Sequence, residues 1–179
     1  METLVAISIF SVSIVAVMVV LGKSMADTNY AKQKIIAEYL AQEGVEYMRN
    51  LRDTYVLYGG RGNQSGWSTF NNRLISGGCS SANGCYFDGE NINYSDSSQP
   101  MADLDIRNCA SGCPALFYNT TSGQYAYSSG GGLVNSGFVR KVTAITNTDE
   151  TKISSTVYWS QGSGTHSVTL STILYNWTE

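Results

Sequence analysis

Four cysteines are the residues whose type and spacing point most directly to chemistry. Cys79, Cys85, Cys109 and Cys113 all lie in a polar stretch rich in Gly, Asn and Ser. An even number of cysteines behind a long apolar segment favours disulfides in an oxidising compartment. Three pairings are open, and of these we favour the local pairs Cys79–Cys85 and Cys109–Cys113. Tetrahedral zinc and free thiols are the alternatives, but the usual CxxC spacings are absent and no histidine lies nearby, so we expect no metal site.

The remaining polar residues give no catalytic constellation. His166 is the only histidine, and its place beside a Gly/Ser turn predicts a solvent-facing loop residue rather than a catalytic base. Asp88 with Glu90, and Asp103 with Asp105, offer oxygen ligands for calcium, but the spacing of an EF-hand is absent. We therefore expect solvated acidic loops, no cofactor and a protein that is not an enzyme. The net charge of -3 also argues against a nucleic-acid partner.

The N-terminal segment is apolar enough to enter a membrane. No charged residue occurs from Thr3 to Leu21, and nineteen helical residues span roughly 30 Å, the thickness of the hydrocarbon core of a bilayer. A cleaved secretory signal is disfavoured because no basic residues precede the apolar run and the run is long. A simple single-pass anchor stays open as an alternative.

Helical periodicity continues well past the apolar segment. Residues 25–58 contain no proline, and charged residues occupy much of one face, with Glu46 and Arg49 spaced for an i,i+3 contact. The apolar residues recur at steps of three and four: Ala31, Ile35, Ile36, Tyr39, Leu40, Val45, Met48, Leu51 and Tyr55. One helix of about 55 residues, ended by Gly59-Gly60, would be about 85 Å long. Its half at 1–24 is apolar on all sides and must lie in lipid or against copies of itself, while its half at 25–58 docks on a small domain.

The rest of the chain predicts an α+β fold. Residues 59–137 form a loop-rich region that holds the cysteines, with short apolar islands at Cys85–Phe87 and Ala115–Tyr118. Residues 138–179 contain three stretches rich in Val, Ile, Thr, Tyr and Trp, separated by turn-like sequences: Phe138–Thr146, Lys152–Ser160 and Ser167–Trp177. We expect an antiparallel meander of three or four strands, packed on the second half of the helix.

Two segments of the helix resemble a known family. The first is Glu2-Thr3-Leu4-Val5-Ala6-Ile7-Ser8-Ile9-Phe10, and the second runs from Ala37-Glu38-Tyr39-Leu40-Ala41 to Asp53. The first resembles the N-terminal processing and methylation motif of type IV pilins and pseudopilins, and the second is similar to the later helix of many bacterial pilin-like proteins. The resemblance covers roughly residues 1–57. In the family a short basic leader ending in Gly precedes the motif; it lies outside this sequence, and Met1 stands where the family has an apolar residue.

This resemblance implies a function in assembly. It places the assembly glutamate of the family on Glu2, which would neutralise the N-terminal amine of a neighbouring subunit inside an apolar filament core. The implied precursor sits in the cytoplasmic membrane, is processed by a prepilin peptidase, and is built by the pilus machinery into an extracellular homo-oligomeric filament for adhesion or motility, with contact to a host cell or other surface. A minor pilin or pseudopilin serving as tip adhesin, in DNA uptake or in type II secretion, and an anchored extracytoplasmic binding domain, are the alternatives. The core helix residues would be Leu4, Val5, Ile7, Ile9, Phe10, Ile14, Val17 and Leu21.

Overall fold

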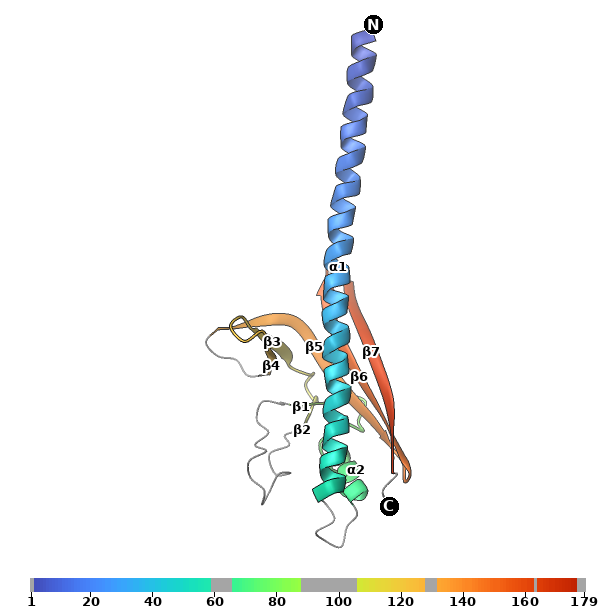
Figure 1. Cartoon of the computed structure of the whole chain (residues 1–179), viewed down its shortest axis with the longest axis vertical. Coiled ribbons are helices and arrows are strands. Elements are labelled where there is room, and N and C mark those ends of the chain that lie inside the picture. The colour runs from blue at the N-terminus through green and yellow to red at the C-terminus, as the bar shows by residue number, and fades with distance from the viewer. Residues whose placement is uncertain (1, 59–65, 88–105, 128–131, 163, 177–179) are drawn as a thin grey trace. The chain divides into compact units, whose positions relative to one another are not determined.

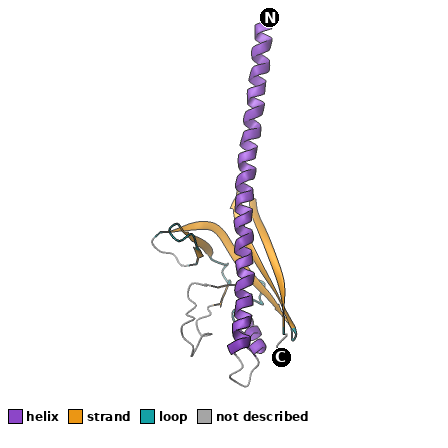
Figure 2. Ribbon diagram, viewed as in Figure 1, coloured by secondary structure: helices purple, strands orange, loops and turns teal. Residues whose placement is uncertain are grey.

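The computed structural model describes residues 2–58, 66–87, 106–127, 132–162 and 164–176. Helix α1 extends over Glu2–Tyr58, and a second helix, α2, over Gly66–Ser76. The chain divides into two compact parts, residues 1–36 and residues 37–179. We call them the N-terminal part and the C-terminal part and describe each by itself. The expected α+β class, with a long N-terminal helix and an antiparallel sheet, is confirmed (Figures 1 and 2).

The sheet of the C-terminal part is larger than the predicted meander. Strands β5, β6 and β7 form the meander itself, at Leu133–Thr146, Glu150–Gln161 and Gly164–Tyr175. The expected meander is therefore present with three strands, and four short strands outside it extend the sheet to seven: β1 (Cys85–Phe87), β2 (Ile106–Asn108), β3 (Ala115–Asn119) and β4 (Tyr125–Ala126). All described pairs are antiparallel, and β5 joins β1 and β3 to the meander. The long β5 therefore ties the disulfide region to the C-terminal hairpins.

One face of this sheet is covered by residues 37–58 of α1. Burial alternates strictly along β6, where Ile153, Ser155, Val157 and Trp159 point inward, as expected for a strand with one covered face. The opposing residues of α1 are buried at helical spacing: Leu40, Val45, Met48, Leu51 and Tyr55.

Three residues of the predicted apolar face lie elsewhere. Ala31 is exposed, and Ile35 and Tyr39 are 52% and 68% exposed, so their assignment to the docking face is wrong. Arg52, although charged, is buried and donates a hydrogen bond to the Tyr175 carbonyl at 3.1 Å. The covered face of α1 is therefore narrower and rotated relative to the one that periodicity predicts. The predicted contact of Glu46 with Arg49 is present, at 2.7 Å.

Helix α2 falls inside the region that was expected to be loops. Its buried side chains are Trp67, Phe70 and Leu74, which follow the three- and four-residue steps of an amphipathic helix. The Trp67 indole donates a hydrogen bond to the Thr148 carbonyl at 2.7 Å, which fixes α2 against the turn between β5 and β6. Gly66 lies so close to the end of α1 that a Cβ there would meet backbone atoms of Tyr55 and Val56. The helix lies beside the C-terminal end of α1 in Figure 1, and its buried side chains belong to the core cluster.

A buried tyrosine makes the C-terminal part sensitive to alkali. Burial raises the pKa of the Tyr55 phenol above its ordinary value of 10.0, and the nearby Arg73 offsets this only in part. Above that pH the unfolded chain loses this proton before the folded chain does, so stability should fall as the pH rises from about 10 through the folded pKa. Urea midpoints at pH 8 and at pH 11 should therefore differ more for the wild type than for Tyr55→Phe. A Tyr175→Phe variant, changed at an exposed site, should keep the wild-type difference.

Candidate functional site

The first half of α1 begins with its one acidic residue. Glu2 lies in the first turn of the helix, where a carboxylate interacts favourably with the helix dipole and the free N–H groups. No other charged residue follows on α1 until Lys23. Glu2 is thus an isolated charge at one end of an apolar rod.

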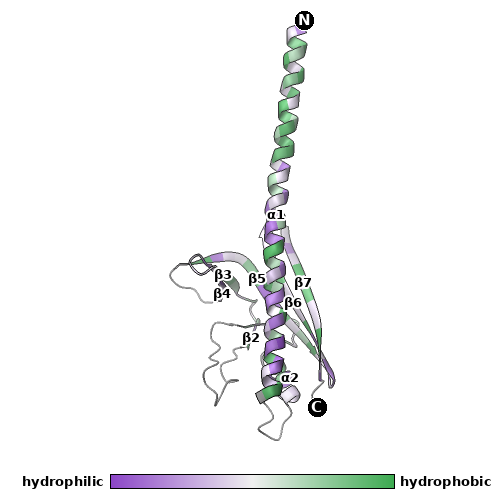
Figure 3. Ribbon diagram, viewed as in Figure 1, coloured by the Kyte–Doolittle hydropathy of each residue, from purple (hydrophilic) through white to green (hydrophobic). Residues whose placement is uncertain are grey.

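The expected core helix residues are all exposed in the single chain. Thirteen large apolar side chains between Leu4 and Leu21 have exposed fractions between 41% and 70%, and Figure 3 shows the apolar colour continuing around this half of the helix. They include every residue that the resemblance assigns to the core: Leu4, Val5, Ile7, Ile9, Phe10, Ile14, Val17 and Leu21. Soluble monomers rarely expose a contiguous patch of this size. Each such side chain gains about 1.5–3 kcal/mol when it is fully buried, so this surface has a strong tendency to leave water.

Three serines interrupt the apolar sequence without making the helix surface polar. The hydroxyls of Ser8, Ser11 and Ser13 each donate a hydrogen bond to the carbonyl four residues earlier, at 2.8 Å. Since the hydroxyl protons are satisfied within the helix, they need no partner from water or from a neighbour. The stretch is long and apolar enough to cross a membrane, by length and composition. It is therefore compatible with membrane anchoring.

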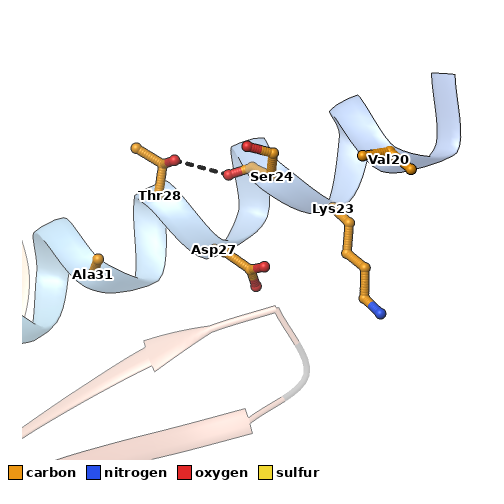
Figure 4. Close-up of a pocket in the computed structure, with 6 residues that line it drawn as sticks. All are labelled: Val20, Lys23, Ser24, Asp27, Thr28 and Ala31. Atoms are coloured by element: carbon orange, nitrogen blue, oxygen red, sulfur yellow. Dashed lines mark hydrogen bonds between the residues drawn. The ribbon is translucent and has the colours of Figure 1, made fainter. Parts of the chain in front are cut away.

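The apolar surface ends where a helix face of mixed polarity begins. This face follows helical steps of three and four and is formed by Val20, Lys23, Ser24, Asp27, Thr28 and Ala31. Figure 4 shows Lys23 and Asp27 extending from the same side of the helix, while Thr28 bonds back to the Ser24 carbonyl at 2.8 Å. Lys23 and Asp27 are thus the first charged groups after Glu2, and they bound the apolar stretch at its other end.

Both local disulfides are formed in the structure. Cys79–Cys85 lies inside the core cluster with both cysteines fully buried, and Cys85 begins β1. Cys109–Cys113 closes a turn whose residues Ser111 and Gly112 are exposed. The described residues contain no free cysteine and no group of three metal-ligating side chains.

The two disulfides should differ in their response to a reductant. A water-soluble phosphine added to the folded protein should open Cys109–Cys113 first, because Cys113 is partly exposed, whereas Cys109 and both cysteines of the other bridge are buried. Intact mass should rise by two hydrogens, and by four only after a denaturant is added. Each short loop contributes about 2 kcal/mol through the unfolded chain, so the first reduction should leave the fold intact. Equal reduction of both bridges in the folded protein would contradict this burial difference.

A buried arginine that the sequence analysis missed joins α1 to the sheet. The Arg140 side chain, on the inner face of β5, is only 3% exposed. One of its terminal nitrogens lies 3.1 Å from a Glu43 carboxylate oxygen and donates to the Leu40 carbonyl at 3.3 Å. Its guanidinium lies 4.5 Å from the Phe87 ring centroid. Its position in the inward series of β5, between Phe138 and Val142, is the signal that could have found it.

Of the remaining candidate residues, only His166 lies in the part of the chain that the structure describes. His166 belongs to β7 rather than to a loop, and its ring is half-buried beside Trp159, with 5.5 Å between centroids. The expectation of a solvent-facing loop histidine is therefore wrong, because β7 begins two residues earlier and turns this side chain inward. The acidic residues at 88, 90, 103 and 105 lie outside the described residues, as do Gly59 and Gly60. Searches against models of known families, curated proteins and solved structures found no match for this chain.

Proposed function

We propose that this chain is a structural subunit of an extracellular type IV pilus-like filament, built by packing the first half of α1 against the same segment of other copies. The single observation that supports this most strongly is the apolar surface from Leu4 to Leu21, which no described residue of the chain covers. Before assembly, lipid would cover these apolar side chains, and after assembly neighbouring helices would cover them. The precursor would sit in the cytoplasmic membrane and the product at the cell surface.

Glu2 has the role of a pairing group in this proposal. A carboxylate enclosed among apolar helices is costly unless an opposite charge neutralises it. The free N-terminal amine of a processed neighbour supplies that charge. A translated copy makes a contact that never closes on itself, and such contacts propagate into a helical fibre.

The proposal predicts that Glu2→Ala reduces filament yield at least tenfold, as judged by electron microscopy of sheared surface fractions, because an amine without a counter-charge disfavours docking. Glu38→Ala, which removes an exposed carboxylate in the second half of α1, is the matched control and should assemble normally. Both variants should keep the protease resistance of the C-terminal part. A wild-type chain that remains a monodisperse membrane-bound monomer under native conditions would contradict the proposal and favour an anchored binding domain. If Glu2→Ala gave the wild-type yield of filaments, the proposed pairing role of Glu2 would be wrong, but the proposed filament function would stand.

A minor pilin or pseudopilin is the second candidate, because the same exposed helix would serve a subunit that caps or initiates a filament. Gold-labelled antibodies against the C-terminal part separate the two. Labelling along the whole fibre supports a major subunit, and labelling restricted to tips supports the minor one.

A further inference from the structure

Strand β7 forms an open edge of the sheet. It pairs with β6 along its whole length, in twelve consecutive pairs from Glu150↔Tyr175 to Gln161↔Gly164. Among the described residues no strand pairs with its other side. Every second residue of β7 therefore presents its backbone N–H and C=O groups outward from the sheet.

This edge has none of the features that usually protect an edge strand. Gly164–Tyr175 contains no Asp, Glu, Lys, Arg or Pro, and its register with β6 has no bulge. Natural edge strands are normally short, charged, interrupted by proline or bulged, since an open ladder recruits a further strand. A twelve-residue uncharged edge is therefore a docking surface for another strand.

The side chains of β7 specify what that strand must look like. On the outer face of the sheet they carry hydroxyls that bond to hydroxyls of β6, Ser171 to Ser154 at 2.8 Å and Thr169 to Thr156 at 2.9 Å. On the inner face they are largely apolar, with Leu170 37% exposed at the open edge. The matching strand thus alternates hydroxyl and apolar residues and carries no charge. The middle of β7 itself has this pattern, with Ser167, Thr169 and Ser171 on the outer face and Val168 and Leu170 on the inner face. Toward its ends Ile173 and Tyr175 also lie on the outer face, and His166 and Thr172 on the inner face.

We propose that β7 of a second copy pairs antiparallel with this edge, about a two-fold axis at Leu170. This register places Thr169 opposite Ser171 and Val168 opposite Thr172, so that hydroxyls meet on the outer face, as they do between β6 and β7. No like charges face each other across the new ladder. The contact is isologous, with the same patch used by both copies.

The size of this contact determines where it operates. Eleven paired residues at about 3.4 Å each form a ladder of roughly 37 Å, and with a sheet thickness of about 10 Å each copy buries about 400 Å². The total of about 800 Å² is below the 1,200 Å² of a stable complex, so a single pair is transient. Rows of such contacts gain strength through multivalency. This step rests on the proposed filament, in which β7 edges repeat along the fibre.

The two-fold axis also fixes the polarity of the partners. It lies perpendicular to the sheet and reverses every direction within the sheet plane, including that of residues 37–58 of α1, which cover the sheet. Copies within one filament are related by translation and rotation about the fibre and therefore point the same way. The β7 contact consequently joins two filaments of opposite direction, such as those that reach toward each other from facing cells.

A lysine on the edge strand tests the contact in filaments. Thr169→Lys places two like charges, one from each copy, diagonally across the two-fold axis. Thr156→Lys is the control: it removes the same Thr156–Thr169 hydroxyl pair, but β6 has a paired strand on both sides and no open edge. In electron micrographs of wild-type and Thr156→Lys filaments, we expect lateral antiparallel pairs at low salt. Thr169→Lys should yield as many filaments with at least fivefold fewer pairs. Equal pairing in the two lysine variants would overturn the proposal.

Cysteine trapping tests the same register without filaments. In detergent-solubilised full-length chain, oxidation of Leu170→Cys should give a covalent dimer, because residue 170 faces itself across the axis at a distance that a disulfide spans. Val168→Cys faces Thr172 and should remain at least fivefold less cross-linked. If the wild-type chain formed no filaments, the proposed function would be refuted. If Leu170→Cys still formed the covalent dimer, this inference would stand. Equal cross-linking of the two cysteine variants would refute the inference.

Discussion

Arg140→Ala is expected to lower the free energy of unfolding of the C-terminal part by about 2–4 kcal/mol, because it empties a buried site and removes a stacked cation. The lost contacts are those with the Glu43 carboxylate, the Leu40 carbonyl and the Phe87 ring. Urea denaturation followed by tryptophan fluorescence measures the loss, since Trp159 lies in the same layer of the sheet.

Arg140→Met separates packing from charge. The methionine side chain keeps most of the apolar stem, and replacing a buried ion pair by an apolar side chain is often neutral or stabilising. The Nε atom of Arg140 is buried with no hydrogen-bond partner among the described residues, so the guanidinium is incompletely satisfied and the loss of its charge costs little. We expect Arg140→Met within about 1 kcal/mol of wild type. A methionine variant as unstable as the alanine variant would mean that the ion pair itself, rather than the packing, stabilises the fold.

Gly44→Ala is expected to destabilise the C-terminal part by about 1–3 kcal/mol, the usual range for overpacking a filled core. A Cβ at this position of α1 would overlap the Ser155 hydroxyl and would lie 3.1 Å from the Ser155 Cβ and 3.2 Å from the Arg140 Cδ. Alanine favours a helix over glycine by about 1 kcal/mol, so the steric penalty must exceed that gain. Thermal unfolding followed by circular dichroism gives the difference.

The chain supplies its own control for this change. Gly22 lies in the same helix, and a Cβ there meets nothing within 4 Å. Gly22→Ala should therefore add helical stability without any clash. Adding Ser155→Ala to Gly44→Ala should recover part of the loss, since the closest overlap involves the hydroxyl. If Gly44→Ala is as stable as wild type, α1 does not approach β6 as closely as the structure has it.

Long periodic elements were predictable from sequence. Helix α1 was expected to end before Gly59-Gly60 and ends at Tyr58, and the three strands of the meander occur where β-branched and aromatic residues cluster. Each of these elements has a local cause, either an uninterrupted helical sequence or an alternating strand between turn residues. The exposed apolar surface of the candidate site could also be predicted from the sequence, because no later segment of the chain is apolar enough to cover it.

Features that depend on distant contacts were not predictable. The partners Arg140 and Glu43 are far apart in sequence and meet only once α1 lies on the sheet. Tyr39 has the spacing of a core residue, but the sheet covers a narrow arc of α1 that excludes it. Helix α2 contains Ser, Thr and two Asn residues, which favour turns, and it is held by the burial of Trp67 and Phe70.

The serine hydroxyls that bond back within α1 affect how this helix behaves as a single subunit in lipid. With Ser8, Ser11 and Ser13 satisfied internally, the apolar half presents nearly the same surface at every azimuth and has no preferred rotation about its axis. In the proposed filament, the orientation of an incoming subunit would then be selected by the charged groups at the two ends, Glu2 and the pair Lys23 and Asp27. The apolar part of such a helix would set no rotational preference, so the charged groups at its two ends would determine how it docks on a neighbour.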